Sequence, residues 1–80
     1  MTEGFRKESV TYEIVYYLGA LNERDRAGYQ KEVNIVSWND NPAKIDIRAW
    51  NEDHTQMRKG ITLSDDEAEV LLKLLKERYE

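Results

Sequence analysis

The sequence predicts an α+β fold, in which a four-stranded antiparallel sheet is followed by one C-terminal helix (ββββα). Residues 10–63 contain four segments rich in β-branched and aromatic residues, and short polar turns separate them. Residues 64–80 instead carry leucines at helical spacing behind a helix-start signal. The 80 residues include no cysteine, so we expect packing or a second copy of the chain, rather than disulfides, to stabilise the fold.

The four expected strands follow one another with short polar connections. They cover residues 10–21, 29–39, 44–50 and 57–63. The turn between the second and third carries the sequence DNP, a strong turn signal. Gly60 interrupts the fourth strand and marks either a bulge or a close approach of another backbone.

The second expected strand does not alternate cleanly. Val33 and Ile35 would face one side of the sheet, whereas Val36 would face the other. Trp38 would share the side of Val36. Either both faces of this strand are partly covered, or a bulge near Asn34 shifts the register.

The third expected strand, KIDIRAW, alternates strictly. Its apolar face, formed by Ile45, Ile47 and Ala49, is the face that we expect in the core. The opposite face carries a cation, a carboxylate, a guanidinium and an indole, namely Lys44, Asp46, Arg48 and Trp50.

The helix is expected to start at Ser64, because Glu67 follows at the spacing of a capping box. One apolar stripe faces the sheet and consists of Ala68, Leu71, Leu72, Leu75 and Tyr79. Val70 and Leu74 widen this stripe beyond what a single small sheet can cover. We therefore expect a homodimer whose interface includes Val70, Leu71, Leu74 and Leu75.

The charge is unevenly distributed along the chain, which carries a net charge of -4. Residues 1–25 carry three basic and five acidic side chains, and residues 64–80 carry three and six. Residues 26–63 carry six basic and five acidic side chains. The acidic ends argue against non-specific binding of duplex DNA, whereas the middle leaves room for a local basic patch.

No sequence feature predicts an enzyme. A cysteine nucleophile, a Gly-x-Ser-x-Gly motif and a glycine-rich phosphate loop are all absent from the sequence. His54 is the one histidine and lies in a polar segment that we interpret as a solvated turn, and zinc would need more nitrogen or sulfur ligands. Asp65 and Asp66 are explained by the first turn of the helix. We expect no catalysis, metal, cofactor or small-molecule substrate.

No segment resembles a signal peptide or a membrane span, so we expect a cytoplasmic protein. We expect a single domain over residues 1–80. Whether residues 1–8 are ordered stays open.

Lysine, arginine and tryptophan alternate along the polar sides of the middle strands. Aromatic rings can stack on unpaired bases while cations contact the phosphates, a combination typical of proteins that bind single strands. A structural alternative stays open, in which Asp46 pairs with Arg48 or Arg58 and Trp50 caps the sheet edge.

IDIRAW, followed by RKGITL and a capped helix, resembles the positive cofactor 4 family of transcriptional coactivators. It looks most like the small bacterial YdbC-like members, in which VSWND precedes a similar pair of strands. The resemblance covers about residues 29–77. It implies a homodimer with the helices at the interface and curved sheets that bind single-stranded DNA with little sequence preference.

The resemblance also implies roles for individual residues. Ile45, Ile47, Ile61 and Leu63 would lie in the core. The residues that would contact the nucleic acid are Lys31, Trp38, Lys44, Arg48, Trp50, Arg58 and Lys59. Two other functions stay open: binding of single-stranded RNA, which differs by its 2′-hydroxyl group, and a protein-interaction module that uses the wide helix face.

Overall fold

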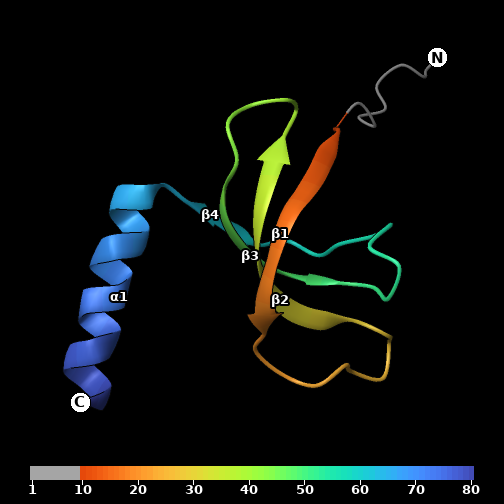
Figure 1. Cartoon of the computed structure of the whole chain (residues 1–80). Helices are drawn as coiled ribbons and strands as arrows, with labels where there is room; N and C mark the ends of the chain where they lie inside the picture. The colour runs from red at the N-terminus through yellow and green to blue at the C-terminus, as the bar shows by residue number, and fades with distance from the viewer. Residues whose placement is uncertain (1–9) are drawn as a thin grey trace.

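The computed structural model describes residues 10–80 (Figure 1). These residues form a four-stranded antiparallel sheet and one C-terminal helix, which confirms the predicted fold class. The expectation for residues 1–8 lies outside the described residues. Within residues 10–80, no helix is long and apolar enough to cross a membrane. The elements are β1 (Tyr12–Ala20), β2 (Gln30–Trp38), β3 (Lys44–Trp50), β4 (Ile61–Leu63) and α1 (Asp65–Tyr79).

The strands pair in sequence order, β1-β2-β3-β4. The register between β2 and β3 is regular, from Gln30 opposite Trp50 to Val36 opposite Lys44. β3 has the predicted bounds, whereas β4 is shorter than the expected strand over residues 57–63. Met57 forms only an isolated bridge with Trp50, and the regular pairing with β3 begins at Ile61.

The register irregularities lie in β1 and not in β2. They fall between Ile14 and Tyr16 and between Tyr17 and Gly19. A bulge in β2 near Asn34 is therefore wrong, since β2 pairs regularly with β3. The other explanation, that both faces of β2 are partly covered, is confirmed by its burial pattern. The extra residues in β1 increase the local twist of this edge of the sheet.

The most buried face of the sheet is opposite to the predicted one. We call it the inner face; its fully or almost fully buried residues are Glu32, Asn34, Val36, Asp46 and Trp50. Ile45 and Ile47, expected in the core, are only half-buried on the opposite outer face, and Ile61 is 55% exposed. The expected assignment of the core is thus wrong for the single chain, because residues 51–58 cover the inner face whereas α1 leaves most of the outer face open.

Aromatic rings fill the space under this covering segment. The Trp50 ring centre lies 5.2 Å from that of Tyr12 and 5.5 Å from that of His54. Trp38 stacks nearly parallel to Trp50, with 6.3 Å between ring centres. The Tyr12 hydroxyl donates to the backbone oxygen of His54, which fixes the segment above the sheet.

His54 is therefore not in a solvated turn, which corrects the interpretation from sequence. The residue is half-buried, and its Nε2 atom lies 2.9 and 3.1 Å from the two carboxylate oxygens of Glu32. Its backbone is left-handed, with φ of 59°, which the turn at residues 51–54 requires. The pair with Glu32 satisfies a carboxylate that is only 2% exposed.

The helix begins at the predicted capping box. Ser64 Oγ accepts a hydrogen bond from the backbone N–H of Glu67, and Glu67 Oε1 accepts one from the backbone N–H of Ser64. α1 lies beside the sheet and is joined to β4 by a short connection (Figure 1). None of its residues is buried, so the described chain leaves an apolar helix surface uncovered.

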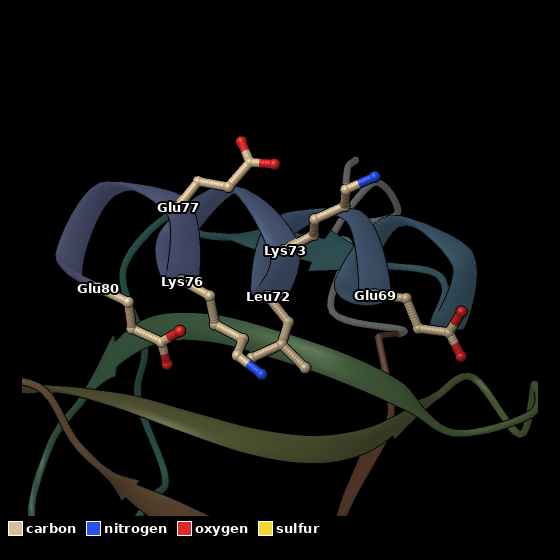
Figure 2. A pocket seen from close by; sticks show the side chains of 6 residues that line it. All are labelled: Glu69, Leu72, Lys73, Lys76, Glu77 and Glu80. Atoms are coloured by element: carbon tan, nitrogen blue, oxygen red, sulfur yellow. The ribbon is translucent and has the colours of Figure 1, made fainter.

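Charged side chains of both signs occupy another part of the helix surface. Figure 2 shows that Lys73 and Glu77 point to one side of the helix, whereas Leu72 and Lys76 point to the other. Glu69 precedes Lys73 by four residues, the favourable order for such a pair on a helix. This part of α1 is suited to solvent rather than to a ligand.

Candidate nucleic-acid interface

Four of the seven predicted contact residues line one shallow hollow. Lys31 extends from β2 and lies opposite Ala49 of β3 in the register of the sheet. The backbone N–H of Arg58 donates to the Ala49 oxygen at 3.0 Å, which brings the chain before β4 to the same place. The hollow is lined by Lys31, Ile47, Arg48, Ala49, Arg58, Lys59, Gly60 and Ile61.

Gly60 allows the basic segment to pack directly against β3. A Cβ atom at this position would overlap the Cβ of Arg48 and the backbone oxygen of Ile47. The close backbone approach predicted as one reading of Gly60 is confirmed. Glycine is required here by space and not by a left-handed conformation, since its φ is not in the positive range.

Arg48 is held by Asp46. Arg48 Nε and Nη2 donate to the two carboxylate oxygens of Asp46 at 2.6 and 2.8 Å. Asp46 also accepts from Thr62 Oγ1 at 2.9 Å and from Trp38 Nε1 at 3.2 Å. The structural alternative, in which Asp46 pairs with Arg48, is thus observed, and the guanidinium is mostly committed to a fully buried carboxylate.

The two tryptophans differ in what they can contact. Trp50 is fully buried, so its ring is not open to a base, which corrects the expectation that it offers a stacking surface. Trp38 is half-buried, and the guanidinium of Arg48 lies 4.6 Å from its ring centre. Part of Trp38 therefore stays exposed, whereas Trp50 is enclosed among the rings of Tyr12, Trp38 and His54.

Arg58 forms a second, more exposed arrangement. Its Nη1 atom lies 2.7 Å from Asp25 Oδ2, and its guanidinium lies 4.1 Å from the ring centre of Tyr29. Arg58 therefore pairs with Asp25 and not with Asp46, which corrects that part of the structural alternative. The backbone N–H of Tyr29 and, next, the side chain of Arg58 hold the pKa of Asp25 below its ordinary value.

The remaining cations are exposed. Lys31 and Lys59 flank the hollow, and no ion pair within residues 10–80 engages either. Lys44 is also exposed, but it lies opposite Val36 on the inner face, whereas Lys31 lies opposite Ala49 on the outer face. The hollow thus has a partly apolar floor and two ammonium groups that no ion pair within residues 10–80 engages, which suits a flexible anionic chain more than a compact ligand.

Sequence reasoning missed the residues that surround Arg58. Tyr29 carried a weak signal, as an aromatic residue beside a loop glycine at the start of a strand. Asp25 carried none, because it is separated from Arg58 by 33 positions and pairs with it only through the tertiary fold. Within the described residues, His, Asp and Glu side chains do not gather into a group of three that could hold a metal ion.

Residues 26–74, more than half of the chain, match the family described as Transcriptional Coactivator p15 (PC4). The chain belongs to this family. It is also 38% identical over 72 residues to an uncharacterized protein of Treponema pallidum (strain Nichols), and this covers 90% of the chain and 84% of that protein. Both findings agree with the resemblance to small bacterial members. Membership of the PC4 family supports nucleic-acid binding as the general function of the domain.

Proposed function

We propose that the protein binds single-stranded DNA, with little sequence preference, as a homodimer. The observation that carries the proposal is the hollow in which Lys31, Arg58 and Lys59 converge over an apolar floor in a PC4-family domain. Cations at this spacing can follow a phosphate backbone without reading base edges. A single strand is favoured over a duplex because the chain is acidic overall.

Each predicted contact residue takes a role consistent with its surroundings. Lys31, Arg58 and Lys59 contact phosphates at the hollow, whereas Lys44 lies on the inner face and makes a separate contact with the strand. Trp38 is half-buried beside the nearly parallel ring of Trp50 and the guanidinium of Arg48, and it contacts the strand on the inner face through the part of its ring that stays exposed. Trp50 acts only indirectly, by supporting Trp38.

A second copy of the chain is proposed to cover the apolar surface of α1. Val70, Leu71 and Leu74 line a shallow and almost wholly apolar hollow on this helix. Leu75 is 47% exposed beside them. On the outer face, the row of Ile35, Ile45 and Leu63 beside the hollow is also incompletely covered, so a dimer that leaves the hollow open would bury apolar surface from both elements.

The test is a fluorescence titration with an oligo-dT of about 20 nucleotides at several salt concentrations, with duplex DNA of equal length as the comparison. Trp38 should report contact through quenching. We expect binding to the single strand that weakens with salt, with a slope of about 0.7 per phosphate contact on logarithmic axes. Lys59→Ala should lower this slope by about 0.7.

Lys73→Ala is the matched control, since this lysine lies on the charged surface of α1 (Figure 2). It should leave the slope unchanged. Equal binding of duplex and single strand, or no binding at low salt, would contradict the proposal. Preferential binding of oligo-rU would assign the site to RNA, and a monomeric chain that binds no oligonucleotide would favour a protein-interaction module that uses the exposed helix.

A further inference from the structure

The ion pair between Asp25 and Arg58 connects the loop after β1 to the chain before β4. Both side chains are about half-exposed, 44% for Asp25 and 48% for Arg58. The pair between Asp46 and Arg48 differs, because Asp46 is fully buried and Arg48 is only 15% exposed. The Asp25–Arg58 pair can therefore open without exposing a buried charge, whereas the Asp46–Arg48 pair cannot.

The loop backbone fixes the carboxylate of Asp25. Asp25 Oδ1 accepts from the backbone N–H of Tyr29 at 2.9 Å, and the backbone N–H of Asp25 donates to the Tyr29 oxygen at 2.7 Å. Gly28 also donates its backbone N–H to the Asp25 oxygen at 2.9 Å. The guanidinium of Arg58 makes no hydrogen bond to the backbone among the described residues and rests on the Tyr29 ring, so it can turn away from Asp25 while this stacking is kept.

Arg58 also lines the hollow, together with Lys31 and Lys59. Arginine binds carboxylate and phosphate oxygens through the same forked pattern of N–H donors. In the free protein, the carboxylate of Asp25 already occupies part of this fork. The lysines at the hollow have no such internal partner within residues 10–80.

We propose that Asp25 is an internal competitor of the nucleic acid: its carboxylate holds Arg58 in the free protein, and a backbone phosphate of the bound strand takes its place. This inference rests on the proposed function and adds a regulating contact to the same site. Tyr29 keeps the guanidinium next to the hollow in both states, since stacking on the ring does not depend on Asp25. The competitor lowers the affinity for any polyanion. The affinity is lowered least for a strand that places a phosphate beside Arg58.

Asp25→Asn tests the proposal in the full chain. Asparagine keeps an oxygen for the Tyr29 N–H but removes the charge that holds Arg58. Because an exposed ion pair contributes little, the affinity for oligo-dT should rise by only about 1.4- to 5-fold.

Asp53→Asn is the matched control. Asp53 is another exposed loop aspartate, and its carboxylate accepts hydrogen bonds from Thr55 rather than from a cation. It reports the effect of removing one negative charge from the protein. The gain from Asp25→Asn should exceed that from Asp53→Asn, and the excess should disappear when both are measured in an Arg58→Ala background.

Three results would overturn the proposal. An equal gain from the two asparagine variants would make the effect one of net charge. A gain that persists without Arg58 would assign it to another residue. Weaker binding by Asp25→Asn would make Asp25 a positioning residue for Arg58. If the unaltered protein does not bind oligo-dT, the proposed function itself fails, and that outcome is distinct from all three.

Discussion

Asp46 is a buried charge whose acceptor oxygens are all used. It is fully buried and accepts four hydrogen bonds, two from Arg48 and one each from Trp38 and Thr62. A buried ion pair of this kind adds little net stability, yet removing one partner leaves the other uncompensated and costs several kcal/mol. The main role of Asp46 and Arg48 is therefore to fix the positions of side chains on the inner face, and any contact with a ligand is secondary.

Gly60 provides the sharpest prediction for a single residue. Gly60→Ala should reduce the free energy of unfolding by about 1 to 3 kcal/mol, because the added methyl group overlaps Arg48 and a backbone oxygen of β3. Urea unfolding followed by tryptophan fluorescence measures the change. Gly19→Ala is the control, since nothing lies within 4 Å of a Cβ atom at that strand position. A loss of stability at Gly19 equal to that at Gly60 would contradict the packing argument.

The sequence could predict only some of these residue contacts. The alternation in KIDIRAW correctly separated two faces of β3, and local pairing of Asp46 with Arg48 was a recognisable alternative. The sequence could not tell which face would be buried, because that depends on residues 51–58 folding over the sheet. The pairing of Arg58 with Asp25 also depends on how residues 51–58 fold over the sheet.

At the scale of elements, the most predictable signals were local ones. The capping box located the start of α1, and alternation located β3 to the residue. The bulges in β1 and the short β4 were not predictable, since both follow from how the strands adjust to one another in the sheet. Lys44 lies apart from the hollow for another reason, because it pairs with Val36 on the inner face whereas Lys31 pairs with Ala49 on the outer face.

The cap of α1 should contribute strongly to its helicity. A 15-residue helix with no buried side chain is close to the length at which isolated helices are marginal in water. Ser64→Ala removes the oxygen that accepts the Glu67 N–H and should cost about 0.5 to 2 kcal/mol. Circular dichroism during thermal unfolding should show earlier loss of the helical signal.

Ser37→Ala serves as the comparison for the cap. Its hydroxyl donates to the backbone oxygen of Asn41 in an exposed turn between β2 and β3. This substitution removes one hydroxyl group without touching the helix, so the helical signal should be retained to higher temperature than in Ser64→Ala. Identical unfolding of the two variants would mean that the cap does not limit the stability of α1.

At the scale of the whole molecule, the described chain leaves two apolar surfaces open at once. In the register of the sheet, Tyr16, Ile35 and Ile45 form a row across the outer face that continues to Leu63. Tyr16 is 61% exposed, and Leu74 on α1 is 55% exposed. Exposed apolar surfaces on both the sheet and the helix are typical of a chain that associates with another.

Leu74→Glu should therefore shift the protein toward the monomer. A symmetric interface contains the substituted residue twice, and each leucine withdrawn from apolar contact costs about 1.5 to 3 kcal/mol. The dissociation constant of the dimer should therefore rise at least about 100-fold. Sedimentation equilibrium measures the change. Lys73→Gln alters net charge by the same amount on the charged surface of the helix and should leave the dimer intact. An unaltered protein that stays monomeric at micromolar concentration, or a Leu74→Glu variant that dimerises as before, would exclude this helix surface as the interface.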